Sequence, residues 1–216
     1  MAKSAVKTAG DLKKQPSSDP GPKCQAIVCA AAKVFLNLGF GAASMDSIAE
    51  EAKVSKQTVY SHFGSKEALF EAILENKCDE LLAPVTRPLV PGPDYAETLN
   101  EVARRFLGAV LAPPSTALFR VIVGESGRFP ELAQAFYRAG PETAVKSLAE
   151  YLLELDKAGL LSIPDPKASA QRFFSLLRGD FYMRRLLDLA PQPTPKENEA
   201  VAADAVSAFL SIYGSK

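Results

Sequence analysis

The sequence predicts an all-α protein of about nine helices, with a small N-terminal helix-turn-helix unit and a larger helical domain after it. Three observations support this fold class. Apolar residues recur at spacings of three and four along almost the whole chain. Prolines and glycines fall between these periodic segments, where helices begin and end. No segment has the alternation of a half-buried strand, and 216 residues with 47% hydrophobic and 23% charged side chains are typical of a globular protein.

The start of the chain differs from the rest. Residues 1–21 hold four lysines among serine, glycine and proline, with almost no large apolar side chains. Such a segment buries too little apolar surface to offset the entropy that is lost on ordering. We expect a disordered basic tail, which is either an arm that touches DNA or a solvated leader.

The apolar runs are short. The longest one, 26–32, is well below the roughly 20 residues that span a bilayer. The N-terminal segment also lacks the basic start, apolar stretch and cleavage site of a signal peptide. We therefore expect a cytoplasmic protein without membrane contact.

The first part of the chain contains four predicted helices, over 22–38, 45–52, 56–62 and 66–83. Gly39 and Gly64 follow apolar periodic segments and act as helix stops. Ser44, Ser55 and Ser65 each precede a helix in the position of an N-cap, where a hydroxyl oxygen accepts from a free backbone amide.

A proline-rich stretch over 84–93 predicts a linker, because proline is excluded from helix interiors. Five more helices follow, at about 95–110, 113–123, 130–155, 164–187 and 195–213. Pro141 falls inside the third of these, so we expect it to kink that helix or to split it in two.

The net charge of zero conceals an uneven distribution. Up to Lys66 there are nine lysines against five carboxylates, a net charge of +4, and the rest of the chain carries −4. A basic first third favours a polyanionic partner for that segment, although a difference of this size also arises by chance.

Two short helices joined by a tight turn predict a helix-turn-helix, in which the second helix can enter a major groove. On that second helix Val59 faces inward. The outward residues are Lys56, Gln57, Thr58, Tyr60, Ser61 and His62. Glutamine can bond adenine, lysine can reach guanine, and hydroxyls suit phosphates. The alternative is an ordinary helical hairpin with a solvated polar face.

The run over 39–70, GFGAASMDSIAEEAKVSKQTVYSHFGSKEALF, resembles the N-terminal DNA-binding domain of the TetR family of transcriptional repressors. The resemblance implies a homodimer whose recognition helices read successive major grooves of a palindromic double-stranded DNA operator. It also implies release of DNA when a small-molecule effector binds the C-terminal domain and shifts the helix over 66–83. We assign 1–21 to the tail, 22–66 to DNA binding, and 67–216 to ligand binding and dimerisation.

The resemblance also implies roles for single residues. Ser44, Ser55 and Lys66 would bind phosphates, and Tyr60 and His62 would lie along the sugar-phosphate chain. Lys56, Gln57, Thr58 and Ser61 would face bases or the adjacent backbone. The serines cap helices in any case, and Tyr60 has packing as its alternative role. Lys53 stands where the family's turn usually has glycine, at a cost of about 1 kcal/mol if its backbone is left-handed.

The C-terminal part is rich in aromatic residues, which suit either a core or a mainly apolar or aromatic ligand between helices. The expected pocket residues are Phe106, Phe119, Ile122, Val123, Phe136, Tyr151, Phe173, Leu177 and Arg178. Arg120, Glu125, Arg178 and Asp180 would orient a polar group or form internal ion pairs. The segments 119–137 and 176–181 resemble the C-terminal domain of one TetR subgroup.

The family places the dimer interface on its last two helices, which implies Phe174, Leu186 and Phe209 as participants. Both predicted helices are amphipathic, as such contacts require.

Other function classes lack supporting residues. One histidine and no nucleophile, metal or phosphate-loop motif argue against an enzyme, a metal site or any cofactor. Cys24 and Cys29 are expected to be buried as small hydrophobes, with a redox-sensing repressor as the alternative. A helical adaptor that binds protein and not DNA is the remaining alternative function.

Overall fold

A computed structural model describes residues 21–86 and 89–214. In this part of the chain there is no strand, and one isolated bridge joins Leu161 to Gly214. The helices are α1 Pro22–Ala42, α2 Met45–Glu51, α3 Lys56–Phe63, α4 Lys66–Thr86, α5 Tyr95–Val110, α6 Pro113–Glu125, α7 Pro130–Tyr137, the π-helical η1 Arg138–Glu142, α8 Thr143–Lys157, α9 Pro166–Leu177, α10 Asp180–Leu186 and α11 Pro195–Tyr213. The predicted all-α fold is confirmed, and the predicted tail lies outside the described residues except for Gly21.

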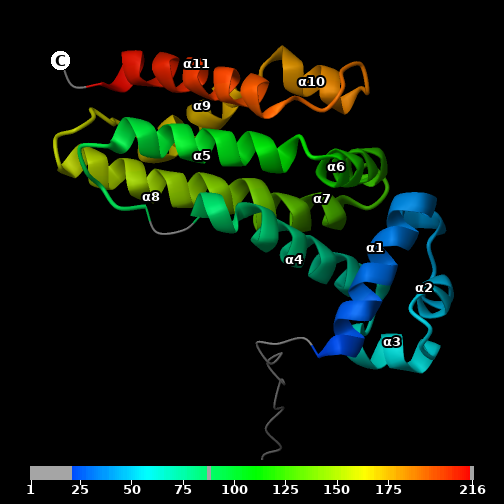
Figure 1. The fold of residues 1–216 in the computed structure, drawn as a ribbon. Coiled ribbons are helices and arrows are strands. Elements are labelled where there is room, and N and C mark those ends of the chain that lie inside the picture. Colours follow the sequence, from blue (N-terminus) through cyan, green and yellow to red (C-terminus); the bar gives the residue numbers. More distant parts are fainter. Residues whose placement is uncertain (1–20, 87–88, 215–216) are drawn as a thin grey trace, which may run out of the picture.

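The first three helices form the predicted helix-turn-helix unit, which lies at one end of the molecule (Figure 1). The backbone of Gly39 (φ 77°) interrupts α1, and Gly64 (φ 76°) ends α3. Lys53, in the turn between α2 and α3, has a φ of 54°. Lys53 therefore has a left-handed backbone, the case in which its side chain costs stability.

Two predicted helices divide. The helix expected over 130–155 becomes α7, η1 and α8, with Pro141 inside η1. Proline clashes with the carbonyl four residues earlier, and a wider π turn accommodates it while the Thr143 hydroxyl donates to the Arg138 carbonyl oxygen at 2.9 Å. The helix expected over 164–187 breaks into α9 and α10, because the backbone of Gly179 leaves the helical region (φ −50°, ψ −163°).

The predicted linker is wrong at its start. Helix α4 continues to Thr86 and so includes Pro84. A single proline removes one backbone hydrogen bond, and its restricted φ is compatible with a helix, so the last turn of α4 tolerates it.

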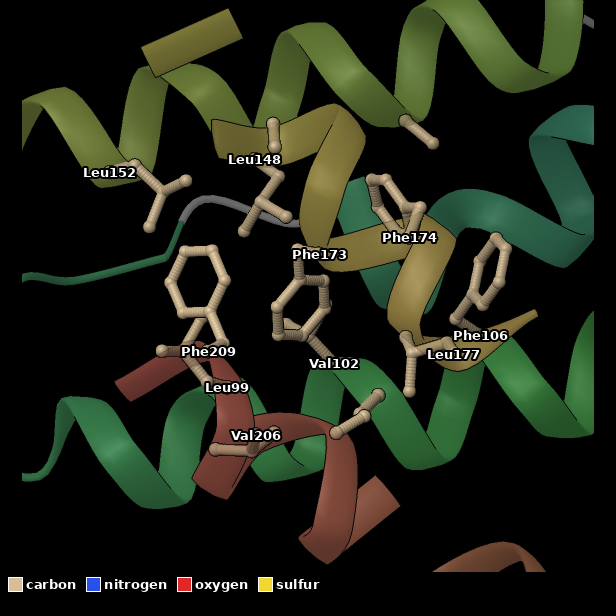
Figure 2. Packing of buried hydrophobic residues seen from close by; sticks show 14 of the residues in the cluster. Leu99, Val102, Phe106, Leu148, Leu152, Phe173, Phe174, Leu177, Val206 and Phe209 are labelled. Atoms are coloured by element: carbon tan, nitrogen blue, oxygen red, sulfur yellow. The ribbon is translucent and has the colours of Figure 1, made fainter. Parts of the chain in front are cut away.

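The larger core lies between α5, α8, α9 and α11, whose apolar faces meet (Figure 2). The Phe173 ring, from α9, packs edge-on against the Phe209 ring of α11, with centroids 5.3 Å apart. The Phe174 ring contacts the Phe106 ring of α5 at 4.7 Å. Because all four rings point inward, this core fixes the orientation of both α9 and α11.

A second core joins the helix-turn-helix unit to the rest of the molecule. It contains Leu69 and Phe70 from the start of α4, and also Ile122 of α6 and Leu132 of α7. Helix α4 contributes its later residues to the larger core, so it spans both cores (Figure 1). The domain boundary between 66 and 67 stays a prediction.

Helix α1 is long and apolar enough to meet the composition criterion for a membrane span. Helices α5 and α6 meet it only as a pair bent by 66°. The apolar side of α1 is buried, however, with Ile27 and Phe35 in the second core. A core helix of a globular domain meets the same criterion.

Candidate nucleic-acid interface and effector cavity

The outer face of α3 is polar and exposed, and its inner face is anchored. Val59 is fully buried in the second core, which fixes the rotation of α3 about its axis. That rotation exposes Lys56, Gln57, Tyr60, Ser61 and His62 and leaves Thr58 half-buried. The structure thus brings the predicted recognition residues together on one surface.

The hydroxyls of the N-cap serines Ser44 and Ser55, which are predicted to bind phosphates, already have partners. Ser44 Oγ accepts from the Ser47 amide at 3.1 Å, and the Ser47 hydroxyl accepts from the Ser44 amide at 3.1 Å. Ser55 Oγ accepts from the Thr58 amide at 3.1 Å. These two predicted caps are confirmed, and so is the third, because Ser65 Oγ accepts from the Ala68 amide at 3.1 Å. Phosphate contacts by Ser44 and Ser55 stay predictions.

The Lys56 ammonium is engaged by a carboxylate from another helix. Its Nζ lies 2.8 Å from Asp46 Oδ2, at the first turn of α2. The hydrogen bond and charge of Asp46 raise the pKa of Lys56. None of the residues predicted on the outer face of α3 is acidic, but Asp46 of α2 places a carboxylate beside that face. The acidic first turn of α2 was the only signal in the sequence.

Lys66 is placed differently from the expectation. Its ammonium donates to the carbonyl oxygens of Phe40 at 2.8 Å and Ala43 at 3.0 Å, and Nζ lies 4.4 Å from the Phe40 ring centroid. The side chain therefore satisfies carbonyls at the end of α1. Two of its three donors are used, so a phosphate would have to bind the third.

The helix-turn-helix unit also contacts α6 and the segment after it. The Gly41 amide donates to Glu125 Oε1 at 3.1 Å, and the Phe40 and Phe129 rings meet with centroids 4.9 Å apart. Glu125 was expected beside the ligand pocket or in an ion pair, and this is a correction. Its carboxylate binds backbone at the junction instead.

A cavity of about 330 Å³ opens between α4, α5, α6, η1 and α10. Its lining residues are Lys77, Cys78, Leu82, Phe106, Ala109, Val110, Ser115, Leu118, Phe119, Phe136, Gly140, Pro141, Ala144, Phe174, Arg178, Tyr182, Met183 and Leu186. Four predicted pocket residues are among them, namely Phe106, Phe119, Phe136 and Arg178.

The other five predicted pocket residues lie elsewhere, which corrects their assignment. Tyr151, Phe173 and Leu177 are buried in the larger core, and Ile122 belongs to the second core. Val123 is exposed on α6. Helical periodicity identifies an apolar face but does not distinguish a solid core from a cavity wall.

The predicted dimer residues also need correction. Phe174 and Phe209 are buried inside this chain's own core (Figure 2), and both Phe174 and Leu186 line the cavity. The exposed residues of α11 instead include Ala203 and Ser207, which share one side of the helix, and Ile212 near its C-terminal end.

The two polar residues Arg120 and Asp180 do not line the cavity. Arg120 donates to the carbonyl oxygens of Leu186 at 2.7 Å and Arg185 at 2.9 Å, and it lies 3.4 Å from Asp188 Oδ1. Arg120 therefore ties α6 to the end of α10.

The cysteines are distributed differently from the expectation. Cys29 is exposed and Cys24 half-buried, whereas Cys78 is buried in the cavity wall. Neither is a core residue, because Cys29 lies on the side of α1 opposite its buried residues and Cys24 lies on the first turn of that helix, where burial is partial. Burial raises the pKa of the Cys78 thiol to about 11. In the part of the chain that is described, no group of three or more potential ligands is placed to hold a metal.

Two family models match the chain. Residues 27–73 match "Bacterial regulatory proteins, tetR family", and residues 97–215 match "AefR-like transcriptional repressor, C-terminal domain". The second match alone covers more than half of the chain.

Curated relatives are similar over parts of their length. FasR of Mycolicibacterium smegmatis, an HTH-type transcriptional activator, is 38% identical over 80 residues, which cover 37% of this chain and 36% of FasR. RutR of Escherichia coli K12, an HTH-type transcriptional regulator, is 36% identical over 112 residues, covering 49% and 51%. The chain thus matches about a third of the length of FasR and about half of the length of RutR.

Solved structures match almost throughout. The Flavonoid-responsive Regulator FrrA has a TM-score of 0.79 and 36% identity, over 91% of this chain and 99% of that one. A TetR-family transcriptional regulator from Mesorhizobium loti has a TM-score of 0.76 and 27% identity, over 92% and 100%.

Proposed function

The chain belongs to the TetR family of bacterial transcriptional regulators, and from this premise we propose that it is a cytoplasmic repressor that binds a palindromic operator as a homodimer and leaves it when a small molecule binds. That it is a DNA-binding regulator follows from the family. The observation that carries the finer proposal is a pair of separate surfaces in one chain. The first is the exposed polar face of α3, held in place by buried Val59, and the second is an apolar cavity in the larger domain.

Base reading falls to the outward residues of α3. The Gln57 carboxamide has both the acceptor oxygen and the donor NH2 that a bidentate contact to adenine needs, and Thr58 and Ser61 add short hydroxyls. Lys56 reaches a base or phosphate after it leaves Asp46. The sugar-phosphate backbone would be contacted by Tyr60, His62, Ser44, Ser55 and the third ammonium donor of Lys66.

The homodimer would form through the exposed sides of α9 and α11, which lie next to each other (Figure 1). On α11 the residues Ala203 and Ser207 are small and exposed, and they allow helices to approach closely. Ile212, about half exposed, would supply apolar contact. A two-fold pair of chains would place two α3 helices on a palindrome.

Effector release follows from the position of the cavity. Helix α4 contributes Lys77 and Cys78 to the cavity wall, and the first turn of α4 follows α3 directly. Helix α6 contributes Ser115 and Phe119, and its last residue binds the Gly41 amide. A ligand that favours one arrangement of α4 and α6 would shift the spacing of the recognition helices, provided that it binds the two states with different affinity.

The lining of the cavity, one similar solved structure and one family match support a ligand-responsive repressor. Its walls are mostly apolar and include four phenylalanines, which suits an apolar or aromatic effector. FrrA, whose structure is similar, is a flavonoid-responsive regulator. The family model that matches residues 97–215 describes the C-terminal domain of a transcriptional repressor.

The test is selection of bound sequences from random duplex DNA by the full chain, with the affinity of the selected sequence measured against salt. The expected result is an enriched palindrome, a steep salt dependence and a dimer by light scattering. A Ser207→Glu variant should become monomeric and lose the palindrome. Enrichment of no sequence by a dimeric, ligand-free protein would contradict the proposal.

A further inference from the structure

We propose that the effector is an apolar organic anion, whose carboxylate is bound by Arg178 and Tyr182 while its aryl or alkyl body fills the aromatic cavity. This inference rests on the proposed function for its regulatory meaning. The binding preference itself depends only on the cavity.

The cavity has donors and no acids. Its polar wall residues are Lys77, Ser115, Arg178 and Tyr182, together with the Cys78 thiol, and none of the eighteen lining residues is Asp or Glu. Every other wall residue is apolar or glycine. A ligand that enters this cavity therefore meets cations and hydroxyl donors as its only strong polar partners.

Of the two cations, Arg178 is the one that lacks a carboxylate. Lys77 Nζ lies 2.7 Å from Glu80 Oε2, so its charge is already balanced. The Arg178 guanidinium lies 5.9 Å from the Phe106 ring centroid, and among the described residues no carboxylate lies within 4.0 Å of it. A guanidinium presents paired N–H donors that match the two oxygens of a carboxylate.

Tyr182 supplies a second donor beside Arg178. Burial raises the pKa of the Tyr182 phenol, and the charge of Arg178 acts in the opposite direction. The phenol therefore keeps its proton at neutral pH and can donate it. Arg178 and Tyr182 line the same cavity, so both can meet one bound anion.

The break between α9 and α10 brings these groups to the cavity. Arg178 is the C-cap residue of α9, and Tyr182 lies in the first turn of α10. A continuous helix would carry Phe174, Arg178 and Tyr182 on one face. The break instead turns α10 across the cavity, so that Met183 and Leu186 close it beside the aromatic wall.

The size and shape of the cavity suit a small amphiphile. A volume of about 330 Å³ lies at the lower end of the range for small-molecule sites. The Phe119 and Phe136 rings meet at 5.6 Å and form part of its wall. Arg178 and Lys77 are exposed at the edge of the cavity, so a positively charged ligand would meet like charge there and a neutral one would gain no ion pair.

The experiment uses the full chain and two matched series of probes. One series is 2-naphthoate, 2-naphthamide and 2-naphthylmethylammonium, and the other is octanoate, octanamide and octylammonium. Affinities are measured by calorimetry. At least one anion should bind tenfold or more tightly than its neutral and cationic counterparts. Equal affinity within both series, or failure of both anions to bind, would overturn the proposal.

Variants locate the anion site. Arg178→Gln should reduce the preference for the anion to less than threefold, and Tyr182→Phe should reduce it by a smaller factor. Arg184→Gln is the matched control, because Arg184 is exposed on α10 and does not line the cavity. An anion preference that persists in Arg178→Gln overturns the assignment, and circular dichroism checks that each variant is folded.

The result is separable from the proposed function. Operator affinity of the same proteins is measured with and without the anion. Arg178-dependent binding that leaves operator affinity unchanged supports the anion site and contradicts effector release. Operator release by neutral and anionic probes alike supports the proposed function and contradicts the anion site.

Discussion

The Gly41 amide donates a hydrogen bond to Glu125 Oε1 over 3.1 Å, and this contact joins the end of α1 to the end of α6. The approach is close, because a Cβ atom on Gly39 would lie 3.0 Å from the same oxygen. Gly39 has a φ of 77°, which any other residue adopts only with strain. The family suggested α4 as the route from cavity to DNA. Under the proposed function, this contact would make α6 a second route.

Loss of this contact should loosen the junction. Glu125→Ala leaves the Gly41 amide without its charged acceptor, so we expect the free energy of unfolding to fall by about 1 to 2 kcal/mol. Amide hydrogen exchange should become faster at residues 39–43 and unchanged in α11. Glu131→Ala, at an exposed position on α7, is the control. Unchanged exchange at residues 39–43 would contradict a structural role for Glu125.

Removal of the carboxylate beside Lys56 should strengthen binding to any DNA. Asp46→Asn frees the Lys56 ammonium for a phosphate, so non-specific affinity should rise and the salt slope should increase by about one unit. Glu50→Gln is the control, because it changes the net charge equally on the same helix. If both variants gain the same non-specific affinity for DNA, the effect comes from net charge alone.

Gln57 should affect specific binding only. Gln57→Ala should weaken binding to the selected operator by roughly 1 to 3 kcal/mol and leave affinity for random DNA unchanged. Fluorescence anisotropy on both duplexes measures this. Gln134→Ala, on the exposed side of α7, should change neither affinity. An equal loss on both duplexes would assign Gln57 to the DNA backbone.

The turn before α3 should accept glycine. Lys53 has a φ of 54°, where a side chain costs about 1 kcal/mol, so Lys53→Gly should raise the free energy of unfolding by up to that amount. Urea denaturation measures the change. Lys53→Ala also removes the charge but keeps the strain, and it should not stabilise the protein. Equal stabilisation by both would point to charge instead.

The three thiols should react at different rates. With a pKa of about 11, Cys78 is almost entirely protonated at pH 8, whereas Cys29 is exposed. Alkylation of Cys78 should be slow, and its rate should rise about tenfold per pH unit until the pH approaches 11, because the thiolate is the reactive form. Mass spectrometry of modified peptides follows each site, with Cys29→Ser as the control. Rapid labelling of Cys78 at pH 8 would show that the cavity wall opens.

Local signals in the sequence predicted the helix-turn-helix well. The caps of Ser44 and Ser55, the stop at Gly64 and the inward position of Val59 depend on a few neighbouring residues, and all are present. The position of Lys53, where the family's turn usually has glycine, raised the question of a left-handed backbone, and the structure shows one. Tertiary contacts only reinforce these features.

The partners of charged side chains were not predictable in this way. Lys56 meets Asp46 from another helix, Lys66 meets carbonyls of α1, and Glu125 meets an amide 84 residues earlier in the chain. Sequence shows that such residues are polar and exposed or half-exposed. It does not show which elements pass within reach of a long side chain.

The sequence by itself determined that this protein is helical, where most of its helices begin, and which family it belongs to, because capping, periodicity and turn residues act over short distances. Tertiary structure alone decided what each apolar face meets. Phe174 lies between the core and the cavity, Phe209 lies in the core, and Phe119 faces the cavity. In the sequence, each of the three is simply one member of an apolar pattern with helical period. Apolar burial is non-directional, so only the final arrangement of helices determines whether such a face meets its own core, a ligand or a second chain.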